Sequence, residues 1–191
     1  MTRLPTWAEL ISLMRLTLGA PREGAAAVLS DLPRREALWL IFALVIVLTV
    51  LASEIVTFLA SGSILPVLSV TAGQTAVSFL ILLGMHYIPR VFGGTGAFDG
   101  ALILASWLQF IFIFVQFAQV ALILVLPGLT TLVFAASLGL FLWLLSSFVF
   151  VLHRFRSIGR VLMGTVAVLI GMYVIVRLFT GAFGVEFGAA A

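Results

Sequence analysis

Long runs of apolar residues, separated by short polar turns, make up most of the chain. An α-helix needs about 20 apolar residues to cross roughly 30 Å of hydrocarbon. Five runs reach that length, and they predict transmembrane helices over about 37–60, 66–88, 99–126, 129–152 and 158–180. A short Gly/Ala-rich outer tail, residues 183–191, follows. The predicted fold class is an all-α polytopic membrane helix bundle of five spans, over a membrane domain of residues 37–182.

The region before the first run, residues 1–36, has an amphipathic pattern instead. Thr6 and Glu9 have the spacing of a capping box, which marks the start of a helix. Apolar residues then recur at helical spacing. They are Trp7, Leu10, Ile11, Met14 and Leu18. Such a helix can lie in the membrane interface or pack on the bundle, and the sequence leaves both readings open.

The arginines are distributed unevenly over this pattern. Nine of the ten precede the first run or lie in or beside the turns after the second and fourth runs. Only Arg177 falls toward the other side. Because positively charged segments stay in the cytoplasm, this asymmetry predicts a cytoplasmic N-terminus and a C-terminus outside.

Composition supports the membrane interpretation. Hydrophobic residues make up 63% of the 191 residues and charged residues 9%, whereas soluble domains carry about 25% charged residues. With no cysteine, disulfides and thiolate metal sites are excluded. His86 and His153 form no metal-binding pattern, and we expect both to anchor at the cytoplasmic interface. The net charge of +3, spread over loops, favours a membrane surface over nucleic acid as a partner.

Three stretches carry a resemblance to a known family. They are Ala20-Pro21-Arg22-Glu23 with residues 32–37, then residues 90–98, and then Trp107 followed by Gln109 and Gln116. With the five runs and the cytoplasmic N-terminal region, they resemble the bacterial branch of the Yip family. Eukaryotic members of that family are multi-span proteins that interact with Rab GTPases. The resemblance implies a five-span fold in the bacterial inner membrane, and it implies no particular activity.

The glycine-rich turn of residues 90–98 lies between the second and third runs. It lacks the Gly-Lys-Ser/Thr ending of a phosphate loop, so nucleotide binding is not predicted. One reading is a turn that needs positive φ angles, with Thr95 or Asp99 capping the next helix. The other is a cytoplasmic contact for a lipid headgroup or a protein partner. The residues assigned to that contact are Arg90, Gly93, Gly94, Gly96, Arg154 and Arg156.

Two charged residues lie inside the apolar runs. Glu54 and Arg177 fall at matching depths, roughly 25–29 Å from the inner boundary at 1.5 Å per residue. A charge in lipid is stabilised by an opposite charge, so we expect an ion pair between the first and fifth spans. The alternative is that each side chain reaches the outer interface separately.

Four glutamines form a candidate polar seam. Gln109, Gln116 and Gln119 lie within about 80° of one another around a helix that turns 100° per residue. Gln74, in the second span, extends the set. These amides indicate either hydrogen bonds between helices or a polar track for a lipid headgroup or a small solute.

The chain shows no activated nucleophile and no metal-ligand cluster, so neither an enzyme nor a cofactor is predicted. The leading hypothesis is a non-enzymatic adaptor or membrane organiser whose cytoplasmic face contacts anionic lipid or a protein partner. The alternative is a small translocator that moves lipid or a small solute along the glutamine seam. Small residues on the predicted helices permit a homo-oligomer but do not require one.

Overall fold

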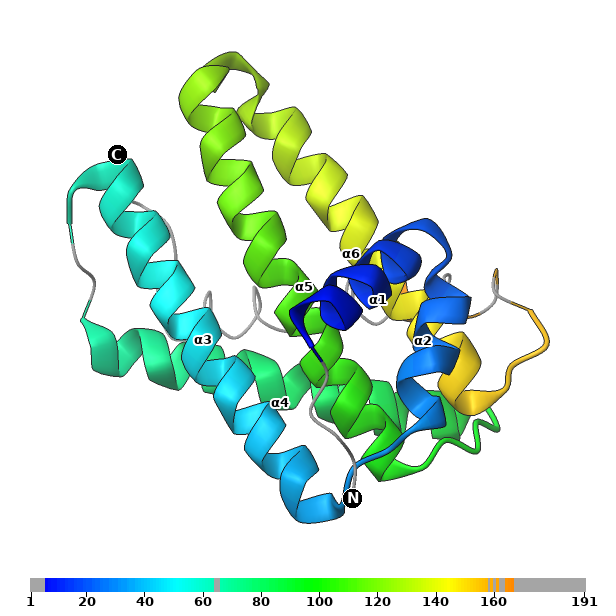
Figure 1. Ribbon diagram of the computed structural model, residues 1–191. Helices are drawn as coiled ribbons and strands as arrows, with labels where there is room; N and C mark the ends of the chain where they lie inside the picture. Colours follow the sequence, from blue (N-terminus) through cyan, green and yellow to red (C-terminus); the bar gives the residue numbers. More distant parts are fainter. Residues whose placement is uncertain (1–5, 64–65, 158, 160, 162–163, 167–191) are drawn as a thin grey trace, which may run out of the picture.

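The computed structural model describes residues 6–63, 66–157, 159, 161 and 164–166 (Figure 1). All regular structure within these residues is helical. Only residues 159, 161 and 164–166 of the fifth expected span are described, and the expected tail lies outside the described residues.

Two short helices form an N-terminal hairpin, α1 (Trp7–Gly19) and α2 (Pro21–Ser30). The expected capping box is present at the start of α1. The Thr6 N–H donates to Glu9 Oε2 at 2.6 Å, and the Glu9 N–H donates to Thr6 Oγ1 at 3.3 Å. The two helices meet closely at Gly24, where an added Cβ would lie 2.6 Å from Thr17 Cα. The hairpin packs on α5 and α6.

Four longer helices follow, α3 (Arg35–Ser61), α4 (Val67–Val91), α5 (Phe98–Val125) and α6 (Thr130–His153). All four are long and apolar enough, by length and composition, to cross a membrane. They coincide with the first four expected spans. The turn between α5 and α6 is a single 3-10 helix, η1 (Pro127–Leu129). A proline has no N–H to continue the helical ladder, so the apolar run divides at Pro127.

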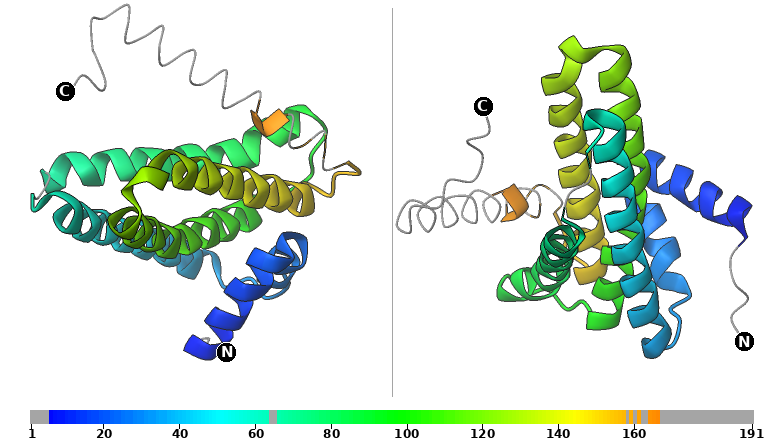
Figure 2. Two further views of the ribbon diagram at one scale, coloured as in Figure 1. Left: turned by 90° about the horizontal axis from the view of Figure 1, so that it is seen from above. Right: turned by 90° about the vertical axis from the view of Figure 1, so that its left-hand side faces the viewer.

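The long helices are not a simple upright bundle. α3, α5 and α6 run beside one another, whereas α4 crosses them obliquely and is seen nearly end-on in one view (Figures 1 and 2). Buried small residues on α5, such as Ala101 and Ala105, let the other helices approach it closely. Phe42 of α3, Leu82 of α4 and Phe148 of α6 are buried in the same hydrophobic core.

Charged residues gather at one end of this arrangement, which we call the charged end. It consists of the N-terminal ends of α3 and α5, the C-terminal ends of α4 and α6, and the loop after α6 (Figure 1). Its charged side chains include Arg34, Arg35, Arg90, Asp99, Arg154 and Arg156. Arg35 Nε lies 3.5 Å from Asp99 Oδ1. The turns at the opposite end, residues 61–66 and 126–129, contain no charged residue.

Candidate functional site

His153, the last residue of α6, connects α6 to the glycine-rich turn and to α4. Pro89 interrupts α4 and has no N–H, so the carbonyl of Met85 four residues earlier loses its helical donor. His153 Nε2 lies 2.9 Å from that carbonyl oxygen, and the Gly96 N–H lies 3.0 Å from His153 Nδ1. A carbonyl only accepts and an N–H only donates. The ring is therefore the tautomer that donates from Nε2 and accepts at Nδ1.

The glycines of the turn are needed for two different reasons, a positive φ angle at one position and close packing at two others. Gly93 has a φ of +85°, a conformation that L side chains rarely adopt. Gly94 and Gly96 instead lie against the end of α6. An added Cβ at Gly94 would lie 2.8 Å from His153 Cγ, and one at Gly96 would lie 2.7 Å from Leu152 Cγ.

The expected helix cap after this turn is wrong. The N-cap of α5 is Ala97, with no side-chain hydrogen bond, and neither Thr95 nor Asp99 caps the helix. Asp99 is the second residue of the helix, two positions after the N-cap, and faces Arg35 instead. The expectation of interfacial histidines is also wrong, because the His86 and His153 side chains are only 4% and 2% exposed.

The six residues expected to form a lipid or partner contact all lie at the charged end, but they divide into two groups. Gly94 and Gly96 face His153, and Arg90 Nη2 donates to the Gly96 carbonyl oxygen at 3.3 Å. The contacts of Gly94, Gly96 and Arg90 therefore stabilise the conformation of the turn. Gly93, Arg154 and Arg156 line a large cavity instead.

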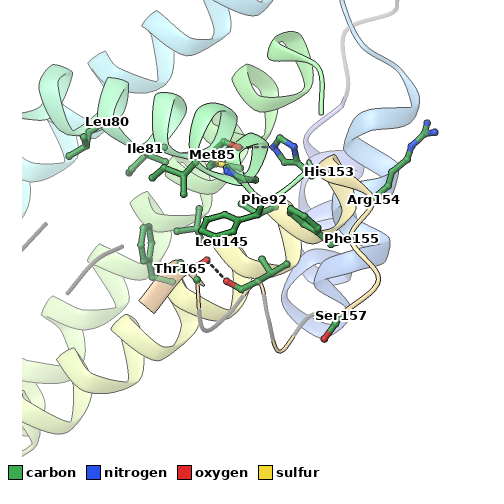
Figure 3. A pocket seen from close by; sticks show the side chains of 18 of the residues that line it. Leu80, Ile81, Met85, Phe92, Leu145, His153, Arg154, Phe155, Ser157 and Thr165 are labelled. Carbon is green, nitrogen blue, oxygen red and sulfur yellow. Dashed lines mark hydrogen bonds between the residues drawn. The ribbon is translucent and has the colours of Figure 1, made fainter. Parts of the chain in front are cut away.

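That cavity is a groove of about 760 Å³ between α4, α6 and the segment after α6, here called the α4–α6 groove. Leu80, Ile81 and Met85 of α4 and Leu145 of α6 form part of its apolar wall (Figure 3). Arg154, Arg156 and Ser157, in the segment that follows α6, also line it. The Arg154 side chain extends outward (Figure 3). No carboxylate is among the described residues that line it.

The four candidate glutamines, Gln74, Gln109, Gln116 and Gln119, all line a second, smaller cavity of about 240 Å³. We call it the glutamine cavity. The Ser78 hydroxyl of α4 donates to Gln109 Oε1 at 2.5 Å, and Gln116 Nε2 donates to Ser53 Oγ of α3 at 3.2 Å. The glutamines of α5 thus both join helices and surround a cavity. The seam's use as a track stays a prediction.

No family model, curated protein or solved structure matches the chain. Glu54 is half-buried on α3, whereas Arg177 lies outside the described residues, so their pairing stays a prediction. Within the described ranges, no cluster of three or more His, Cys, Asp or Glu residues is placed to hold a metal ion.

Sequence reasoning missed the role of His153. A signal was present, because Pro89 frees the Met85 carbonyl and a buried carbonyl needs a donor. The spacing along α4 shows which carbonyl is freed, but it does not show which distant side chain supplies the donor.

Proposed function

We propose that the chain is a multi-span membrane protein of Yip type in the bacterial inner membrane, where it acts as a non-enzymatic adaptor or organiser. Its charged end contacts anionic lipid or a protein partner. The observation that supports this most is the separation of charge, with arginines at one end and uncharged turns at the other. By the positive-inside rule the charged end faces the cytoplasm. In this proposal residues 158–180 form the fifth span and the C-terminus lies outside.

Helix lengths support a charged end that projects from the membrane. α3 has 27 residues and α5 has 28, which correspond to about 40–42 Å. The hydrocarbon core is only about 30 Å thick, so about 10 Å of each helix extends beyond it, and in this proposal that excess lies at the charged end. Trp107 lies about 14 Å along α5 from Phe98, close to this boundary, where tryptophan is enriched in membrane proteins.

The position of Trp107 also supports an interfacial α1. Trp107 Nε1 donates to Thr17 Oγ1 of α1 at 3.1 Å, so the Thr17 end of α1 lies at the same depth as Trp107. Leu10 and Met14 of α1 pack against the core. Trp7 and Ile11 are 73% and 44% exposed, and they leave an apolar strip that membrane lipid can cover.

Cysteine labelling tests this arrangement, because the chain contains no cysteine of its own. Single Ser30→Cys and Ser157→Cys variants should react with a membrane-impermeant maleimide only from the cytoplasmic side. Ser63→Cys and Ala190→Cys should react only from the other side. Release of the protein by carbonate, or the same accessibility for all four positions, would refute the proposed topology.

One observation favours the translocator as a second candidate. Ile81 and Phe141 line both the α4–α6 groove and the glutamine cavity, so the two spaces adjoin at these side chains. Proteoliposomes would show flux of lipid or small solute that Gln109→Leu and Gln116→Leu abolish. Ser137→Leu, outside both cavities, is the matched control. No flux from folded, inserted protein would leave the adaptor as the better account.

A further inference from the structure

The α4–α6 groove has the length of one lipid tail. Its described lining on α6 extends from Phe141 to His153, a rise of about 18 Å. Half the hydrocarbon thickness of a bilayer is about 15 Å. The volume of about 760 Å³ falls within the range of about 300–1,000 Å³ that is usual for ligand pockets. The groove therefore extends from the charged end into the hydrocarbon of the leaflet on that side.

The chemistry of the groove also changes along its length. Leucine, isoleucine, valine and phenylalanine side chains line its inner part, whereas Arg154, Arg156 and Ser157 lie at its charged end. Both arginines are exposed, and neither makes an ion pair within the described part of the chain. An apolar tail below two unpaired guanidinium groups matches a lipid with an anionic phosphate headgroup.

The backbone conformation of Arg154 also supports a headgroup site at this end of the groove. Arg154 ends α6 with a φ of 54°, in the left-handed region that favours glycine. A non-glycine residue held in this conformation often reflects a functional requirement. The Arg154 side chain begins at the end of the groove and extends outward from it, so its positive charge lies beyond the apolar wall (Figure 3).

We propose that the α4–α6 groove binds one anionic glycerophospholipid from the leaflet at the charged end. One acyl chain lies along α4 and α6, and the phosphate lies between Arg154 and Arg156. This inference rests on the proposed membrane location and deepens it, because it gives the lipid contact a defined site. Arg90 is not among the residues that line the groove, and its Nη2 donates to the Gly96 carbonyl oxygen.

Native mass spectrometry of the full-length protein in mild detergent tests the site. Phosphatidylglycerol and phosphatidylcholine with identical acyl chains are titrated separately. Each arginine near an anionic headgroup contributes about fivefold in affinity, so Arg154→Gln with Arg156→Gln should weaken phosphatidylglycerol binding by about thirtyfold and leave phosphatidylcholine unchanged. Arg34→Gln is the matched control, because Arg34 is an exposed arginine of the charged end outside the groove.

A second pair of variants tests the tail. Gly84 lines the groove, and the nearest atom to an added Cβ is Ile88 Cδ1 at 3.7 Å. Gly84→Leu should therefore fold and fill the space, and it should lower binding of both lipids. Gly73→Leu, on the same helix with nothing within 4 Å, should lower neither.

The outcomes separate this inference from the proposed function. Equal binding of both lipids by wild type, or equal losses for Arg34→Gln and the double variant, would overturn the lipid site. So would a dimer that Gly84→Leu dissociates without any change in lipid binding, because a second copy would then occupy the groove. Cysteine labelling reports membrane sidedness independently of lipid binding in detergent, so either result can fail while the other stands.

Discussion

Replacing His153 by leucine should destabilise the fold far more than an ordinary surface change at a helix end. Leucine keeps much of the side-chain volume but removes both ring nitrogens. The Met85 carbonyl and the Gly96 N–H are then left buried without their partners. Each unsatisfied buried group costs about 1–3 kcal/mol, so His153→Leu should cost about 2–6 kcal/mol in the free energy of unfolding.

A second substitution isolates the Met85 part of this cost. Pro89→Ala restores a backbone N–H that can donate to the Met85 carbonyl within α4. In the Pro89→Ala background, His153→Leu should therefore leave only the Gly96 N–H unsatisfied. Its cost should fall by about 1–3 kcal/mol, and this difference is the coupling energy of the cycle.

Equilibrium unfolding in mixed SDS–detergent micelles, followed by circular dichroism, measures the free energy of unfolding of the four proteins in this cycle. They are the wild type, the two single variants and the double variant. Trp107→Phe provides the control. It also removes a buried hydrogen bond, to Thr17, but it should be additive with Pro89→Ala because the two sites share no partner. An equal cost of His153→Leu with proline or alanine at position 89 would refute the explanation of why His153 is buried.

Three further substitutions give expectations on the same unfolding scale. Gly24→Ala should destabilise by about 1–3 kcal/mol, because the new methyl group overlaps the Thr17 backbone, whereas Gly19→Ala, with open space around it, should not destabilise. Gly93→Ala should cost about 1–2 kcal/mol, since the φ of +85° is strained for alanine; an unchanged midpoint would contradict this. Arg154→Gly should raise the free energy of unfolding by about 1 kcal/mol and lower the affinity for phosphatidylglycerol. If stability and affinity both rose, or both fell, the result would count against a functional arginine.

The helices themselves could be predicted well from the chain. A helix needs about 20 apolar residues to cross hydrocarbon, and α3 to α6 follow the expected runs closely. The least distinct boundary, at Pro127 and Gly128, agrees with the structure, because proline has no backbone N–H to donate and so interrupts a helix. Local rules likewise predicted the Thr6–Glu9 capping box.

Relations between distant residues could not be predicted in this way. Run length says nothing about crossing angle, so the oblique path of α4 was not anticipated. Helical spacing grouped the glutamines of α5 on one face, but their partners Ser53 and Ser78 come from two other helices. His153 is a stronger case, because its partners lie 57 and 68 residues away along the chain. Such pairings depend on how the helices pack, which single-sequence patterns do not encode.

The uncharged turns at the far end bear on how the chain enters a bilayer during synthesis. Carrying a charged side chain across hydrocarbon costs about 2.5–3.5 kcal/mol on insertion scales. Neither residues 61–66 nor residues 126–129 present such a barrier. In the proposed topology, each pair of helices, α3 with α4 and α5 with α6, can therefore enter as a hairpin while its arginines stay on the cytoplasmic side. In the proposed topology, insertion of these two hairpins should then depend little on the membrane potential, and a lysine placed at Ser63 should slow insertion of the first hairpin without affecting the second.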